Sequence, residues 1–458
     1  MDKVLLSTVE EYGFYNYILN AVKIHADKKL KKNFTIKKLK LISPSINFFF
    51  FIIKNLFLGV FFDKQKLLKL SYKNCNIGKY ISSALYRDTS SHKSLFILYI
   101  NIFKYLYIAG KIFNTAIKIS NDNQAFYIDH AGYLNGIFYE ILSKKKKLIY
   151  SNVYPRGVFF IDFRKKENFF FQKVENLLRL RKLKKLTNKK REKNINFFEK
   201  ILKKPETIPY MKSTKFNKIK RFNLITNNIN KFEYIIYAHS FTDAQLWYGH
   251  DGFVTLYDWL DFTIKELKEK NVSVLVKGHP NFYNKSIGLM SKIDKEKFTY
   301  LSKKYNSAKI FFLNTPIKNG ELLKKINKKT ILISHHGTAL LEGLYSGFKC
   351  ISSIATFWDP QIKITNQWKS TNEYRLLLNK DWSKLKYPNK NHLLNIIYQV
   401  FLDDNSAYGK NYYLEIFSKI SKITRERMFR LQHNLKVNKK IEIKIINKIS
   451  QNIEEINY

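Results

Sequence analysis

Polar residues able to bind an anion follow three apolar runs in the second half of this 458-residue chain. Pro280 holds His279 out of helical geometry, and Gly337 lets the backbone approach a ligand closely. The amides at the start of a helix near Thr338 attract negative charge, and His279 or Lys277 can add a charge-assisted hydrogen bond. This chemistry suits a phosphate group. The residues predicted to bind it and the nucleoside attached to it are Lys277, His279, Pro280, Ser334, His335, His336, Gly337, Thr338 and Glu342.

Strands and helices are predicted to alternate around these residues. Run 272–276 is β-branched and alternates as a strand does, whereas run 339–345 has helical spacing and ends before Gly347. This alternation indicates a doubly wound parallel sheet, in which ligands bind at the carboxyl ends of the strands. The predicted strands are 232–238, 272–276, 309–313, 330–333 and 350–352, and the predicted helices are 254–270, 320–325 and 339–345.

Binding a phosphate stabilises a leaving group but does not activate an acceptor, so a general base is also expected. Asp129 follows the apolar run 125–128 in the first half, at the carboxyl end of another predicted strand, and is the preferred base. His130 is the second choice. Asp243 and Asp251 compete from the second half, and Glu10 and Glu11 from the first. Glu342 lies one helical turn beyond Thr338, where a carboxylate can accept the hydroxyls of a ribose.

The sequence predicts no metal and no cofactor. His335 and His336 are adjacent, so their side chains are expected to diverge, and the histidines lack the i, i+4 spacing of metal ligands. The pair Asp403-Asp404 is an acidic turn rather than an Asp-x-Asp motif. Two cysteines are too few for a disulfide framework, which favours a reducing compartment and a cytoplasmic protein.

The chain is strongly basic, with 82 Lys and Arg against 36 Asp and Glu and a net charge of +46. Such a surface attracts polyanions, including phospholipid headgroups, but no nucleic-acid recognition motif accompanies the charge. Specific nucleic-acid binding is therefore not expected. Lysines concentrate in segment 164–204, which is predicted to be helical, and either a solvated face or a docking face for an anionic membrane. Segment 46–62 is apolar but interrupted by Lys54, which indicates an interfacial or buried helix rather than a spanning one.

The order of the elements predicts an α/β protein with an amino-terminal domain at 1–225, containing the basic segment 164–204, and a second domain at 226–402. Residues 403–458 are predicted to be helical and to pack back on the other half. Strands are expected in the first domain at 3–9 and 125–128.

The residues between about 235 and 375 resemble those of bacterial capsule polysaccharide biosynthesis proteins, which are related to nucleotide-sugar glycosyltransferases of GT-B fold such as the capsular Kdo transferases. The similarity is carried by Ala238–Trp259, by Lys277-Gly278-His279-Pro280, and by Ser334-His335-His336-Gly337-Thr338-Ala339 with Glu342-Gly343 and Gly347. The resemblance implies two Rossmann-like doubly wound domains facing a cleft. The second would hold a nucleotide-sugar, and the first a glycan or lipid-linked glycan acceptor.

The predicted function is a metal-independent glycosyltransferase of capsule or surface polysaccharide assembly, cytoplasmic or peripheral at the inner face of the cell membrane. The resemblance places His279 and Pro280, with Ser334, Gly337 and Thr338, against the donor phosphate. Two alternatives stay open. One is a polyol-phosphate transferase of the teichoic-acid type, and the other is a non-catalytic protein that binds a polyanion or a membrane through segment 164–204.

Overall fold

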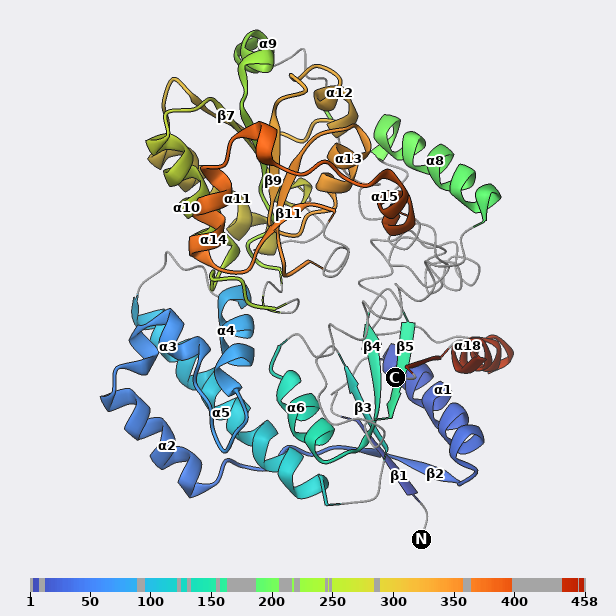
Figure 1. The fold of residues 1–458 in the computed structure, drawn as a ribbon. Helices are drawn as coiled ribbons and strands as arrows, with labels where there is room; N and C mark the ends of the chain where they lie inside the picture. Colours follow the sequence, from blue (N-terminus) through green and yellow to red (C-terminus); the bar gives the residue numbers. More distant parts are fainter. Residues whose placement is uncertain are drawn as a thin grey trace. The chain divides into compact units, whose positions relative to one another are not determined.

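The computed structural model of the chain contains two compact α/β units, each built on a six-stranded sheet (Figure 1). Unit 1 comprises Met1–Leu178 and Asp403–Tyr458, and unit 2 comprises Arg179–Leu402. The structure describes residues 3–7, 13–88, 95–121, 125–129, 133–153, 157–162, 187–205, 216–217, 223–243, 246, 249–283, 289–356, 364–397, 439–451 and 453–456.

The sheet of unit 1 has the strand order β12-β5-β4-β3-β1-β2. All neighbours are parallel except β4 and β5, which are antiparallel because too few residues join them for a crossover helix. The predicted strands at 3–9 and 125–128 are confirmed. The elements are β1 (Lys3–Ser7), α1 (Gly13–Leu30), β2 (Phe34–Lys38), α2 (Ile46–Phe57), η1 (Val60–Phe62), α3 (Lys64–Leu68), α4 (Ile77–Asp88), α5 (Leu95–Ile119), β3 (Ala125–Asp129), α6 (Gly136–Lys144), β4 (Leu148–Val153), β5 (Gly157–Asp162), α18 (Lys439–Gln451) and β12 (Glu454–Ile456).

The end of the chain belongs to unit 1. Helix α18 packs against α1, and β12 pairs with β5, so the last described residues form a strand where the sequence predicted a helix. Residues 403–438 lie outside the described part.

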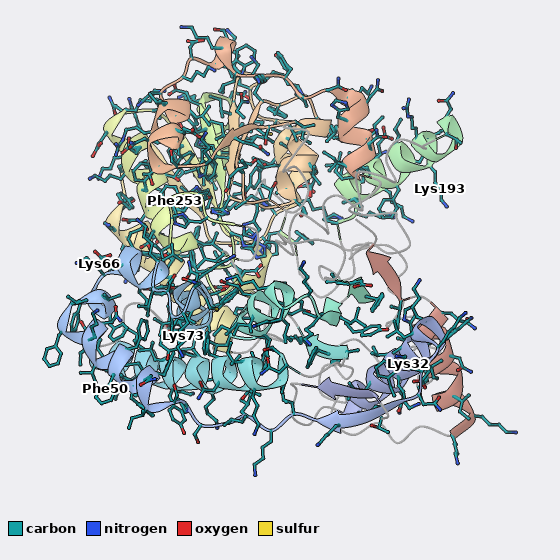
Figure 2. The ribbon with its side chains drawn as sticks, turned by 60° about the horizontal axis from the view of Figure 1, so that its bottom comes forward. Lys32, Phe50, Lys66, Lys73, Lys193 and Phe253 are labelled. Atoms are coloured by element: carbon teal, nitrogen blue, oxygen red, sulfur yellow. The ribbon has the colours of Figure 1, made fainter. Side chains whose placement is uncertain are left out.

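The division between the units falls at Leu178, so the predicted domain boundary at 225 lies inside unit 2. Helix α8 (Asn188–Lys203), the described end of the basic segment, explains the difference because it packs against helices of unit 2. Phe198 and Ile201 of α8 are buried while Lys193 is exposed (Figure 2), as expected for a helix solvated on one side. Residues 164–186 lie outside the described part.

The sheet of unit 2 is parallel throughout, with the order β11-β10-β9-β6-β7-β8. The chain winds outward from β6 in one direction through β7 and β8, and from β9 in the other, which makes it doubly wound as predicted. The elements after α8 are α9 (Asn223–Asn228), η6 (Ile229–Lys231), β6 (Tyr234–Tyr237), α10 (Leu256–Glu269), β7 (Val274–Lys277), η8 (Pro280–Tyr283), α11 (Leu289–Lys304), β8 (Ile310–Leu313), α12 (Asn319–Leu323), β9 (Ile331–Ser334), α13 (Ala339–Tyr345), β10 (Cys350–Ser353), β11 (Asn366–Trp368), α14 (Thr371–Leu378), η10 (Trp382–Lys384) and α15 (Lys390–Ile397).

The core of unit 2 is aromatic. Trp259 on α10 and Trp368 on β11 stack with ring centroids 6.4 Å apart, and the Trp259 indole donates to the hydroxyl of Tyr374. Phe253, labelled in Figure 2, packs on Tyr374. All five tryptophans of the chain lie in unit 2, so tryptophan fluorescence reports on this unit alone. The sheet ends one strand later than predicted, because β11 pairs with β10.

Helix α2 of unit 1 has one buried and one exposed apolar face. Phe48 and Ile52 are buried, whereas Phe50 is 63% and Phe57 is 85% exposed. Segment 46–62 is therefore not wholly buried, and one apolar face of α2 is exposed. Among the described residues, none of the helices combines the length and apolar character needed to cross a bilayer.

Candidate functional site

The parallel register of unit 2 brings three histidines together. Tyr237, the last residue of β6, is paired with Lys277 at the end of β7 and with Ser334 at the end of β9. A histidine lies two residues beyond each of these three strand ends, at positions 239, 279 and 336. They therefore gather at the carboxyl edge of the sheet, at the point where the winding direction changes. This is where ligands bind to doubly wound sheets.

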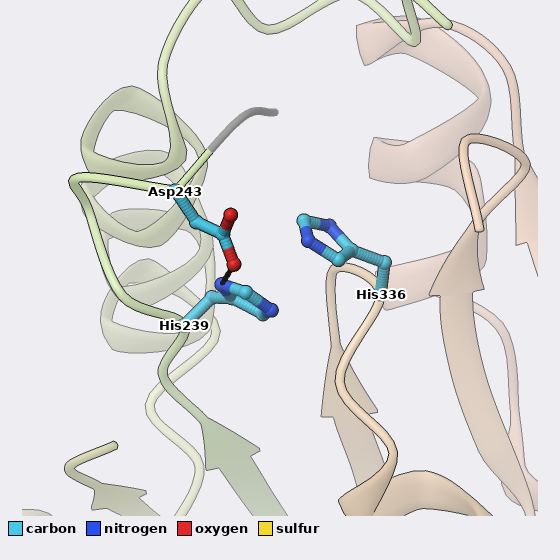
Figure 3. A group of neighbouring side chains, drawn as sticks. All are labelled: His239, Asp243 and His336. Carbon is cyan, nitrogen blue, oxygen red and sulfur yellow. Dashed lines mark ion pairs between the residues drawn. The ribbon is translucent and has the colours of Figure 1, made fainter. Parts of the chain in front are cut away.

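His239 lies between the other two histidines. Its ring centroid is 5.3 Å from that of His279 and 3.9 Å from that of His336. Asp243, on the same loop as His239, approaches it with Oδ2 3.8 Å from Nδ1 (Figure 3). We refer to His239, Asp243, His279 and His336 as the histidine cluster. The sequence prediction that the loops after three strands converge is confirmed for these residues.

His335 supports the cluster and is not part of its surface. It is fully buried, with Nε2 2.7 Å from Oδ2 of Asp251 and Nδ1 2.8 Å from Nδ1 of His336. The expectation that the side chains of His335 and His336 diverge is therefore wrong. Asp251 also accepts hydrogen bonds from Ser353 Oγ and from the amide of Phe253. Asp251 is 1% exposed, and its carboxylate accepts these hydrogen bonds inside the unit. The sequence suggested Asp251 as a candidate general base, a role that needs an accessible carboxylate.

A buried carboxylate fixes the loop that carries His239. Asp294 on α11 accepts a hydrogen bond from Ser240 Oγ at 2.5 Å and another from the amide of Thr242 at 3.1 Å. Burial raises the pKa of Asp294 to about 6. No sequence pattern indicates this contact, because Asp294 lies on a helix about 50 residues further along the chain and only the tertiary structure brings it to the loop.

The turn after β9 is tight, and its polar groups serve the backbone. Ser334 Oγ donates to the carbonyl of Tyr237, and a Cβ at Gly337 would lie 2.7 Å from that same Oγ, so a side chain at this position would displace the hydroxyl from its hydrogen bond. Thr338 occupies the position before α13, but its side chain makes no capping hydrogen bond. The hydroxyl of Ser334 is thus engaged by the backbone, whereas the sequence predicted that it binds phosphate. Helix α13 has only seven residues, so its dipole adds little to anion binding.

Lys277 and Glu342 are both buried, and the charge of each affects the pKa of the other. The Lys277 ammonium lies 5.5 Å from the ring centroid of Tyr237, and burial lowers its pKa to about 8. Burial raises the pKa of Glu342 to about 7, with the nearby Asn319 amide and the charge of Lys277 acting against the rise. Glu342 is 7% exposed, so its carboxylate faces the interior. The sequence had suggested instead that this carboxylate accepts the hydroxyls of a ribose.

The three imidazoles of the histidine cluster favour the neutral form when no ligand is bound. Burial lowers the pKa of His239, and it lowers those of His279 and His336 well below the ordinary imidazole value, with the neighbouring histidines adding to the effect. The sequence predicted a charge-assisted hydrogen bond from His279 or Lys277, and for His279 this requires that the anion first shift its protonation. An anion bound here would favour the imidazolium form, so its binding is expected to take up protons.

The lowered pKa of His279 predicts how stability depends on pH. Below about pH 6.5 the unfolded chain protonates this histidine and the folded chain does not, so His279 removes up to about 1.4 kcal/mol of stability per pH unit of acidification. The stability of His279→Ala should therefore fall less steeply than that of wild type between about pH 6.5 and 5. Urea unfolding followed by tryptophan fluorescence measures both slopes. Equal slopes would contradict the lowered pKa of His279.

The predicted bases of the first half belong to unit 1. Asp129 is the last residue of β3, at a strand end as the sequence predicted. Strand β3 lies next to β1, and the winding direction of this sheet changes between these two strands. Its side chain lies outside the described part of the structure, and so do His130, Glu10 and Glu11.

Comparison with models of known protein families and with curated proteins finds no match. Several solved structures are similar. The β-Kdo 2,4-transferase KpsC of Thermosulfurimonas dismutans is 10% identical and has a TM-score of 0.36, over 59% of this chain and 78% of that one. The trehalose-6-phosphate synthase OtsA is 10% identical with a TM-score of 0.30, over 91% of this chain and 98% of that one.

A UDP-forming α,α-trehalose-phosphate synthase from Burkholderia xenovorans is 7% identical, with a TM-score of 0.31 over 91% of this chain and 99% of that one. Likenesses this low carry no functional argument. The class defined by the chain itself is an α/β protein with two Rossmann-like doubly wound sheets, and the predicted fold class is confirmed in that respect.

Proposed function

We propose that the chain is a nucleotide-sugar-dependent glycosyltransferase of surface polysaccharide assembly. The observation that carries the proposal is the convergence of His239, His279 and His336 at the carboxyl edge of a doubly wound sheet. A nucleoside diphosphate bound at this edge would place its phosphates against the three imidazoles. The arrangement of two Rossmann-like units fits the GT-B fold that the sequence resemblance implies.

The chemistry required of the site is stabilisation of a leaving phosphate. His279, which is protonated against the bound anion, gives a charge-assisted hydrogen bond of about 1.5 to 3 kcal/mol. An acceptor hydroxyl from a glycan or a lipid-linked glycan would attack the anomeric carbon while the nucleoside diphosphate departs. Asp129 of unit 1 remains the proposed general base, because it ends a strand at the corresponding edge of the other sheet.

The first experiment identifies the nucleotide. Thermal unfolding is followed with CMP, CDP, UDP and GDP and with their sugars, using the full chain. A ligand at 100 times its dissociation constant should stabilise the protein by about 2.7 kcal/mol. If none of these ligands shifts the unfolding transition, the nucleotide-sugar proposal is wrong.

A polyol-phosphate transferase would use the same histidines, so a labelled donor must separate the two reactions. A donor carrying one label in the sugar or polyol and another in the phosphate adjoining it is incubated with acceptor. A glycosyltransferase delivers only the sugar label to the product, whereas a polyol-phosphate transferase delivers both.

The exposed face of α2 supports a second part of the proposal, docking of unit 1 on an anionic lipid bilayer. The aromatic surface, as we name it, consists of Ile46, Phe50, Ile53, Phe57, Leu58 and Phe62, each at least 47% exposed. Phe62 packs on Tyr99 of α5, which joins the surface to a second helix. Five lysines and a single acidic residue lie between residues 46 and 73, so the net positive charge of this segment complements anionic headgroups. Figure 2 shows Phe50 and Lys66 in this part of unit 1.

Replacing Phe57 by Glu is expected to weaken binding to vesicles that contain phosphatidylglycerol by at least about tenfold, since a fully buried Phe contributes about 1.5 to 3 kcal/mol. Sedimentation with vesicles measures the bound fraction. The matched control is Leu376→Glu, which changes a residue 72% exposed on unit 2 and should bind as wild type does. Wild-type protein that does not sediment with anionic vesicles, or a Phe57→Glu variant that sediments fully, would refute the docking surface.

A further inference from the structure

A potential metal site lies within the histidine cluster. His239, Asp243 and His336 each offer one ligand atom, and these atoms all lie within 4.8 Å of one another (Figure 3). They come from two loops, after β6 and after β9, whose strands are paired in the sheet. We propose that these three residues bind one divalent cation of the zinc class. This reverses the sequence expectation of no metal.

The distances require only a small closure. Zn–N bonds are about 2.1 Å long, so two ligands of a tetrahedral zinc lie roughly 3.4 Å apart. The present separations, 4.8 Å at most, exceed this by about 1.4 Å. Asp243 can provide the movement, because its side chain is 54% exposed, while His239 and His336 are buried and held by their neighbours. A movement of the exposed Asp243 carboxylate toward the two buried imidazoles would complete the ligand set.

The buried pair Asp251 and His335 orients His336 as a metal ligand. Asp251 Oδ2 lies 2.7 Å from Nε2 of His335, and a tautomer of His336 that donates from Nδ1 to Nδ1 of His335, 2.8 Å away, fits this arrangement. Nε2 of His336 then carries a lone pair. A carboxylate acting through hydrogen bonds to fix the tautomer of a ligand histidine is the usual outer support of zinc sites.

The ligand set selects the kind of cation. Two imidazoles and one carboxylate suit Zn²⁺ and its neighbours Co²⁺ and Ni²⁺, whereas Mg²⁺ and Ca²⁺ prefer oxygen ligands only. Three protein ligands leave a fourth position for water or for an anionic oxygen, as in zinc sites that act on substrates. Binding of the cation does not depend on the nucleotide-sugar proposal, since no nucleotide is needed to complete the protein ligands.

The test uses the full chain, freed of metal with a chelator, and no nucleotide. Titration with Co²⁺ should give one equivalent bound with the intense visible absorption of a tetrahedral site, displaced by Zn²⁺ and not by Mg²⁺. Asp243→Ala, which changes an exposed side chain and should preserve the fold, is expected to weaken Co²⁺ binding at least tenfold. His239→Ala should do the same.

The matched control is His392→Ala, which removes an exposed histidine of α15 in the same unit and should leave binding unchanged. Absence of a tetrahedral Co²⁺ spectrum in wild type, or wild-type affinity in both Asp243→Ala and folded His239→Ala, would overturn the proposal. The nucleotide panel, repeated with chelator present, is read separately. A failure there leaves the metal result standing, and a failure of Co²⁺ binding leaves the nucleotide result standing.

Discussion

His279→Ala is expected to weaken binding of the nucleotide-sugar by about 10- to 150-fold, which corresponds to the 1.5 to 3 kcal/mol of one charge-assisted hydrogen bond to phosphate. His279 stacks on His239 at the edge of the sheet and is not among the proposed metal ligands, so its loss tests the anion site by itself. Isothermal titration with the nucleotide identified by the thermal panel measures the change.

The affinity of wild type should also rise as the pH falls from about 8 to about 6, because burial lowers the pKa of His279 and the bound anion favours its protonated form. This slope should be reduced in His279→Ala. His392→Ala, which lacks an exposed histidine of the same unit, serves as the control and should behave as wild type does. A folded His279→Ala variant with undiminished affinity at every pH would show that the phosphates bind elsewhere.

Asp251→Ala should destabilise unit 2 by about 1 to 3 kcal/mol for each buried donor that loses its acceptor. The variant leaves Ser353 Oγ and the Phe253 amide without the carboxylate that accepts from them, and it removes the group 2.7 Å from His335 Nε2. Asp251→Asn keeps one acceptor oxygen in the same place, so its loss should be smaller. Urea unfolding followed by tryptophan fluorescence measures both, since every tryptophan lies in unit 2.

Glu269→Ala is the matched control for a carboxylate in the same unit. Its side chain is 63% exposed and its pairing with Lys265 spans 3.8 Å, so a change within about 0.5 kcal/mol is expected. If Asp251→Ala were no more destabilising than Glu269→Ala, Asp251 and His335 would not form the buried support that positions His336.

The predictions from sequence were most accurate where a short range of the chain determines the structure. Helix 339–345 was predicted with its observed limits, because its apolar spacing is helical and Gly347 after it adopts a φ of +82°. The strands at 272–276 and 309–313 were recognised from β-branched and aromatic runs and lie within two residues of β7 and β8. Two short strands, β11 and β12, whose own residues only weakly favour a strand, were not predicted. Strand β11 has three residues, and the pairing of β12 depends on a strand nearly 300 residues earlier.

The site shows the same division. His279 and His336 were identified because each follows a strand, and the ends of parallel strands meet at one edge. His335 and Asp251 were assigned to the ligand side, although they face the interior between Trp259 and Trp368. Two adjacent residues in a turn can direct their side chains to solvent or to the core, and only the packing around them selects one.

The order of apolar runs, the glycines and the histidines after strand ends determined by themselves that the second half is a doubly wound sheet with polar loops at one edge. The tertiary structure alone decided that His239, Asp243 and His336 come within ligand distance, and that desolvation lowers the pKa of each of the three clustered imidazoles. The physical reason is that strand periodicity depends on residues that are neighbours in the sequence. Burial and ligand distance depend instead on side chains that come from strands about 100 residues apart.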